Sequence, residues 1–123
     1  MRLLLDTHVI LWWLIDDPGL ADDIKERIDT EVDVFVSAAT TWEITIKQAA
    51  GKVGPADLPE RVASSDLREL PITSRHAIQA GRLPFIHRDL FDRMLVAQAQ
   101  CEGLTLVTRD ANIQKYDVAL LPA

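Results

Sequence analysis

The sequence predicts a single α/β domain in which a central parallel sheet of four to five strands lies between layers of helices. Short apolar runs of strand length alternate with longer stretches of helical periodicity along the chain. Glycine and proline stand between many of these segments, where a helix or strand has to end. A chain of 123 residues has the size of one ordinary domain, so we expect one unit over residues 1–123.

Five segments have the composition of strands, being short, apolar and rich in branched side chains: residues 2–5, 32–36, 67–72, 104–107 and 118–121. The segment at 67–72 is the weakest of these predictions. Helices are expected in the stretches between them, at residues 7–15, 20–29, 38–50, 58–63, 74–81 and 89–102. Because strands alternate with helices, the connections are expected to be βαβ units, which build a parallel sheet.

The composition excludes several classes of protein. The apolar share of 48% and the charged share of 26% are ordinary for a soluble globular domain. A net charge of −6 argues against a broad basic surface for nucleic acid, although it is compatible with a nuclease whose metal-binding carboxylates add negative charge. Cys101 is the only cysteine, and the apolar run at 9–15 is too short to span a bilayer. We expect a cytoplasmic protein without membrane association.

Four acidic residues lie where an apolar strand ends or inside the helix that follows it: Asp6, Glu43, Asp92 and Asp110. In an open α/β sheet, ligands collect outside the carboxyl ends of the strands, so acids that are distant in sequence can meet in one crevice. Carboxylates crowded together repel one another, and without a cation at least one of them would have to protonate. The sequence therefore predicts a site for a divalent cation with a preference for oxygen ligands.

Three of the four acids also have an ordinary structural interpretation. Asp6 could be only the N-cap of the helix at 7–15, and Asp110 could cap a short helix at 111–115 while also serving as a ligand. Glu43 could form a solvent-exposed ion pair with Lys47, four residues later. The equivalent placement of all four acids after strands favours the shared site.

Asp92 and one further acid, Asp89, stand three residues apart in the segment H-R-D-L-F-D-R, on adjacent turns of one helix face. Asp89 is interpreted mainly as the N-cap of the helix at 89–102, in a supporting role. Asp92 is the stronger candidate for a metal ligand. Arg93 follows Asp89 by four residues and could pair with it.

The chain resembles the PIN-domain ribonucleases, and more narrowly the VapC-type toxins of bacterial toxin–antitoxin pairs. The resemblance rests on four motifs in order, L-L-L-D-T-H-V-I-L-W-W-L, V-S-A-A-T-T-W-E-I-T-I-K-Q-A-A-G-K, R-D-L-F-D-R-M-L-V-A-Q-A and L-V-T-R-D, and it covers residues 1–122. It implies that the four acids bind Mg²⁺ or Mn²⁺, with supporting hydroxyls from Thr7, Ser37 and Thr108. It also implies an RNA substrate, an antitoxin partner and a homodimer. One departure is Leu90, where the family often has proline.

Basic residues beside the acids are candidates for contacts with RNA phosphates, which position a strand without reading its sequence. Arg88, Arg93 and Arg109 are the best placed of them. The histidines His8 and His87, like His76, show no metal-ligand spacing such as H-E-x-x-H and are interpreted as structural or surface residues.

Other enzyme classes fit less well. The segment around Gly51 lacks the first glycine and the final Ser or Thr of a phosphate-binding loop, and Asp6 lacks the second acid two places later that aspartyl phosphatases carry. The alternative from another class is a catalytically silent PIN-like module that acts only through a protein partner. Magnesium-dependent loss of intact RNA, abolished by EDTA, separates the enzyme from the module.

Overall fold

The computed structural model describes residues 1–51 and 54–123. The strands are β1 (Arg2–Leu5), β2 (Asp33–Ser37), β3 (Arg68–Leu70), β4 (Thr105–Thr108) and β5 (Leu120–Pro122). The helices are α1 (Thr7–Leu14), α2 (Asp22–Thr30), α3 (Ala38–Ala49), α4 (Leu58–Ala63), α5 (Ser74–Arg82) and α6 (Leu90–Glu102), with a 3₁₀ turn η1 (Ile113–Lys115). Within the described part of the chain, no helix has both the length and the apolar character that crossing a membrane requires.

The predicted parallel sheet is confirmed and has five strands in the order β3-β2-β1-β4-β5. The first strand of the chain lies in the centre, where Leu4 is paired with Phe35 of β2 on one side and with Leu106 of β4 on the other. The chain therefore builds the sheet outwards in both directions from β1. The carboxyl ends of β2, β1 and β4 lie side by side at the point where the strand order reverses, which is where α/β sheets form ligand crevices.

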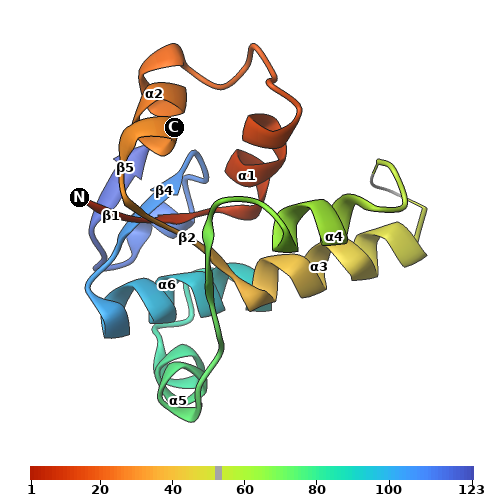
Figure 1. Cartoon of the computed structure of the whole chain (residues 1–123). Helices are drawn as coiled ribbons and strands as arrows, with labels where there is room; N and C mark the ends of the chain where they lie inside the picture. Colours follow the sequence, from red (N-terminus) through yellow and green to blue (C-terminus); the bar gives the residue numbers. More distant parts are fainter. Residues whose placement is uncertain (52–53) are drawn as a thin grey trace.

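Two layers of helices cover the sheet (Figure 1). Helices α1 and α2 lie on one side of the sheet, and α5 and α6 lie on the other, while α3 and α4 pack together beside the carboxyl end of the strands. The α/β/α arrangement agrees with the alternation of apolar residues along the central strand. Leu3 and Leu5 are buried against α1 and α2, whereas Leu4 is buried against α6.

The predicted segments each contain an element, with ends that agree to within two residues. The short helix expected at 111–115 is only a 3₁₀ turn, because the main-chain N–H groups of Lys115 and Tyr116 bond to carbonyls three residues earlier. Helix α6 begins at Leu90 without the proline that the family often has there, since Asp89 supplies the cap. That departure leaves the start of the helix intact.

Candidate metal centre

The four predicted acids are carried by elements that converge at the carboxyl edge of the central strands. Asp6 directly follows β1, and its main-chain N–H donates to the carbonyl of Val107 in β4 at 3.0 Å. Asp110 lies two residues after β4, Glu43 lies in the second turn of α3, and Asp92 lies in the first turn of α6. Residues more than a hundred positions apart are thus brought to one region by the order of the strands.

Asp6 is buried, with 3% of its surface exposed. Its Oδ2 accepts a hydrogen bond from the Thr108 hydroxyl at 2.7 Å, while its Oδ1 has no hydrogen-bond partner among the described residues. Although Asp6 stands at the N-cap position of α1, its side chain makes no capping hydrogen bond. Burial raises the pKa of Asp6, and the nearby charge of Asp110 adds to the rise, whereas the bond from Thr108 opposes it. A buried carboxylate oxygen without a donor is suited to a cation.

The pKa of Asp92 is raised to about 7. Burial is the largest cause, followed by repulsion from the charges of Asp6 and Asp89, with a smaller contribution from Glu43. A hydrogen bond with His87 opposes the rise. Because repulsion reaches Asp92 from α3 and from the end of β1, the acids of separate elements share one electrostatic environment. Of the four predicted acids, all of which the structure describes, only Asp92 and Asp110 have ligand atoms within 4.8 Å of one another in the group that could hold an ion, so a site shared by all four stays a prediction.

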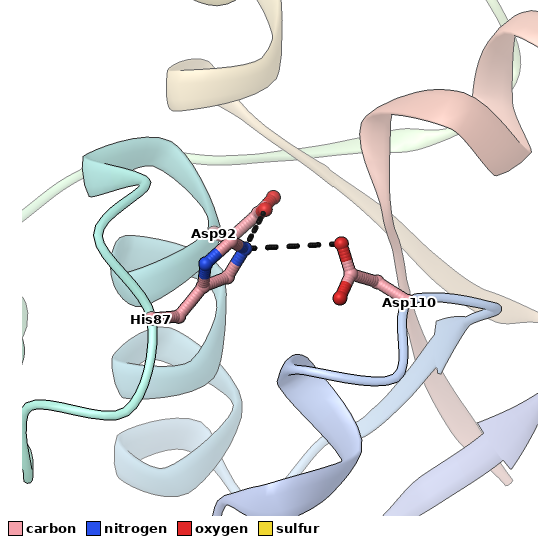
Figure 2. A group of neighbouring side chains, drawn as sticks. All are labelled: His87, Asp92 and Asp110. Atoms are coloured by element: carbon pink, nitrogen blue, oxygen red, sulfur yellow. Dashed lines mark hydrogen bonds and ion pairs between the residues drawn. The ribbon is translucent and has the colours of Figure 1, made fainter.

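Asp92 and Asp110 both approach the same ring nitrogen of His87, Nε2 (Figure 2). The His87 Nε2 lies 2.8 Å from Asp92 Oδ2 and 3.8 Å from Asp110 Oδ2. One ligand atom from each of these three residues lies within 4.8 Å of the others. The second carboxylate oxygen of Asp110, Oδ1, accepts the main-chain N–H of Asn112 at 2.7 Å. Asp110 therefore holds the turn after β4 with one oxygen and presents the other to His87, although the short helix expected after it is only a 3₁₀ turn.

Glu43 is buried, with 4% of its surface exposed, and both of its oxygens are bonded. Its Oε1 accepts from the Thr7 hydroxyl at 2.7 Å, and its Oε2 pairs with Lys47 Nζ at 2.9 Å. The ion pair with Lys47 that the sequence offered as an alternative does exist, but it lies at the border of the site and not on a solvated helix face. Lys47 is itself influenced by the acids, because hydrogen bonding to Glu43 and the charges of Asp89 and Asp92 raise its pKa.

The supporting residues fall into two groups. Thr7 and Thr108 each donate to one of the acids, as the resemblance implied. Ser37 acts elsewhere, because its hydroxyl accepts the N–H of Ala39 at the start of α3 and donates to the buried Gln98 at 2.6 Å. Asp89 accepts the N–H of Asp92 at 3.0 Å, which confirms its interpretation as the N-cap of α6.

The predicted RNA-contacting arginines are placed differently from one another. Arg93 is buried, with 7% exposure, and its guanidinium donates to the carbonyls of Ala80 and Pro84 at 2.9 and 3.0 Å. This position contradicts both a phosphate contact and the pairing with Asp89. Arg109 donates to the carbonyls of Gly19 and Ala123 and stacks over the ring of Trp12. Its guanidinium therefore links α1 and the turn after it to the carboxyl end of the chain, and its contact with RNA stays a prediction. Arg88 is exposed, and its contact with RNA stays a prediction.

His87 is the residue of this site that the sequence interpretation missed. Its ring lies between two acids, whereas it was interpreted as a structural or surface histidine. The usual signal is a second histidine at helical spacing, which is absent here. A weaker signal was available: His87 stands two residues before the cap Asp89, from where a side chain can fold back over the first helical turn, which carries Asp92.

The donor set fits a divalent cation. It offers carboxylate oxygens from three elements, an imidazole nitrogen, an unpartnered buried oxygen on Asp6 and an Asp92 that is hard to ionise without a compensating charge. A bound cation would lower both raised pKa values, since it stabilises the ionised carboxylates.

The profile of the PIN domain family matches residues 3–119. The chain belongs to the PIN domain family. No curated protein is similar enough in sequence to count as a match.

Several solved structures share the PIN fold of this chain over nearly its full length. A DNA-bound VapBC complex from Salmonella typhimurium is 20% identical with a TM-score of 0.75, and the match covers 99% of this chain and 98% of that one. VapBC2 from Rickettsia felis, bound to a fragment of promoter DNA, is 15% identical with a TM-score of 0.76 and coverage of 99% and 98%. VapC20 from Mycobacterium tuberculosis, a toxin that cleaves the sarcin–ricin loop, is 16% identical with a TM-score of 0.68 and coverage of 96% and 97%.

Proposed function

We propose that this PIN domain is a metal-dependent endoribonuclease that hydrolyses RNA phosphodiester bonds and acts as the toxin of a VapC-type toxin–antitoxin pair. The observation that carries the proposal is the meeting of His87, Asp92 and Asp110, which each have one ligand atom within 4.8 Å of the others. The buried Asp6, whose Oδ1 has no partner among the described residues, and the raised pKa values of Asp6 and Asp92 support it. The likeness to VapBC complexes and to a toxin that cleaves the sarcin–ricin loop supports the choice of RNA as substrate.

In this proposal Asp6 and Asp92 hold a Mg²⁺ or Mn²⁺ ion, and Glu43 and Asp110 complete the site directly or through water. When bound, the ion polarises the phosphodiester and lowers the pKa of an attacking water. The chain's own residues keep the acids in place. Thr108 holds one oxygen of Asp6 and leaves the other free, and Thr7 holds Glu43, while Asp89 fixes the turn that carries Asp92.

The chain carries a net charge of −6, so it can attract an RNA backbone only where basic side chains make the surface locally positive. Arg88 lies next to the His87 loop and is exposed, so it is the proposed phosphate contact. Lys47, which lies beside Glu43 and is partly exposed, can also reach the edge of the site. The proposed partners are an antitoxin, as suggested by the similar VapBC complexes, and a second copy of the chain. The proposed location is the cytoplasm.

The test is cleavage of a fluorescent RNA by the purified protein with Mg²⁺, with Mn²⁺ and with EDTA. We expect cleavage in either metal, none in EDTA, and a fall on the order of 100-fold or more in Asp6→Asn and Asp92→Asn, since the ion contributes several kcal/mol to the barrier. Asp117→Asn is the matched control, because it removes the same charge at an exposed position outside the site.

Equal cleavage by all variants would show that the activity is a contaminant or uses other residues. RNA that stays intact in every metal, from a protein that still binds an antitoxin, would instead support the catalytically silent binding module.

A further inference from the structure

We propose that His87 is itself a ligand of the metal ion, so that the centre is a mixed imidazole–carboxylate site that selects Mn²⁺ over Mg²⁺. The proposal rests on the metal site of the proposed function and adds a ligand to it. Mg²⁺ takes oxygen ligands and keeps several waters, whereas imidazole nitrogen is a common ligand of first-row transition metals. A nitrogen ligand therefore changes which ion the site holds best.

The distances around His87 are those of groups that can share one ion. At metal–ligand distances near 2.1 Å, neighbouring ligands of an octahedral ion are about 3.0 Å apart and opposite ligands about 4.2 Å apart. The His87 Nε2 lies 2.8 Å from Asp92 Oδ2 and 3.8 Å from Asp110 Oδ2, and the three ligand atoms all lie within 4.8 Å of one another. The same nitrogen faces both carboxylates (Figure 2).

Hydrogen bonds with Tyr116 and Arg93 hold the loop that carries His87. The main-chain N–H of His87 donates to the Tyr116 hydroxyl at 2.9 Å, and that hydroxyl also accepts from Arg93 at 3.3 Å. The Arg93 guanidinium in turn holds the Pro84 carbonyl at 3.0 Å. Both Tyr116 and Arg93 are buried. The imidazole is therefore presented to the acids by a rigid support, which is the arrangement that precise metal sites require.

A simpler role for His87 would be to orient Asp92 by a hydrogen bond while the ion binds elsewhere. That role explains the 2.8 Å contact with Asp92 but gives no reason for the ring to lie close to Asp110. Direct coordination explains both contacts, since an ion that bridges the two carboxylates would meet the same nitrogen. The two roles differ in whether nitrogen is bonded to the ion, which can be measured.

The experiment is pulsed electron paramagnetic resonance on the full chain loaded with one equivalent of Mn²⁺. We expect electron spin-echo modulation from a directly bound ¹⁴N nucleus, which changes when the histidines are labelled with ¹⁵N. The modulation should be lost in His87→Gln and kept in His8→Gln, a matched control whose exposed imidazole lies near Asp6 but is not part of the three-residue group. Calorimetric titration should show Mn²⁺ affinity falling on the order of 10-fold or more in His87→Gln, with a smaller change for Mg²⁺.

The outcomes separate this proposal from the proposed function. Mn²⁺ that binds the wild-type chain, is lost in Asp92→Asn and yet shows no ¹⁴N modulation would overturn the role of His87 and leave the carboxylate site standing. Modulation that persists in His87→Gln would overturn it as well. A wild-type chain that binds neither Mn²⁺ nor Mg²⁺ would contradict the metal site of the proposed function together with its ligand.

Discussion

Replacing Asp92 by asparagine is expected to stabilise the metal-free protein while it removes metal binding. The substitution keeps the size of the side chain and an oxygen that can accept from His87, but it removes a charge that the fold holds at a cost. The pKa of Asp92 is raised from 3.8 to about 7. Because a tenfold change in proton affinity corresponds to about 1.4 kcal/mol, this rise amounts to about 4 kcal/mol at most.

The sign of the pH dependence follows from the raised pKa. Between about pH 4 and pH 7 the folded protein holds the Asp92 proton more tightly than the unfolded chain does, so rising pH costs the wild type stability. Above pH 7 the full cost is present. The advantage of Asp92→Asn should therefore be largest near pH 8 and should shrink as the pH falls towards 4.

The assay is urea unfolding in EDTA, followed by the fluorescence of the three tryptophans, at pH 8 and at pH 5. Adding Mg²⁺ or Mn²⁺ should narrow the advantage of Asp92→Asn at pH 8, because only the wild type gains binding free energy, about 2.7 kcal/mol at a hundred times the dissociation constant and about 4.1 kcal/mol at a thousand times. Asp117→Asn serves again as the charge control. If Asp92→Asn were no more stable than the wild type in EDTA at pH 8, the picture of crowded, uncompensated carboxylates would be wrong.

Substitutions at three further positions test individual contacts by urea unfolding. Asp89→Ala should cost about 1 kcal/mol because it removes the cap of α6, whereas Asp89→Asn should be nearly neutral; equal losses would show that the cap is not the cause. Arg93→Met should cost on the order of 3 kcal/mol, since it leaves buried carbonyls without donors, and a loss below 1 kcal/mol would contradict that role. Lys47→Met should destabilise the metal-free protein by about 1 kcal/mol, because the buried Glu43 then lacks its cationic partner. For the same reason, added Mn²⁺ should stabilise this variant more than it stabilises the wild type. An unchanged response to Mn²⁺ would place Glu43 outside the site.

The fold class could be predicted from the sequence because its signals are local. The alternation of Leu3, Leu4 and Leu5 between two apolar faces is typical of a strand covered on both sides, and the structure has that arrangement. Acids placed after strands also follow a general rule of α/β sheets, which is why Asp6 and Asp110 could be assigned to one edge. The order of the strands, with β1 in the centre, depends on how the helices pack on the sheet and has no comparable local signal.

The details of the site could not be predicted, because they depend on contacts between distant segments. Ser37 looked like a hydroxyl of the site, but its bond to Gln98 depends on how α6 packs on the sheet. Arg93 was a candidate phosphate contact because it lies beside Asp92, yet its guanidinium donates to carbonyls at the end of α5 and in the loop after it. The position of His87 depends on a hydrogen bond to the Tyr116 hydroxyl, and Tyr116 lies 29 residues away in the sequence.

A crystal structure of the protein soaked in Mn²⁺, with the anomalous signal recorded at a wavelength where manganese scatters strongly, would test the shared metal site most directly. We expect a single strong anomalous peak within coordination distance of the Asp92 carboxylate, shared with Asp6 or Asp110 and absent in crystals of Asp92→Asn. A well-ordered crystal with no peak there, or with manganese only at unrelated surface acids, would contradict the shared site.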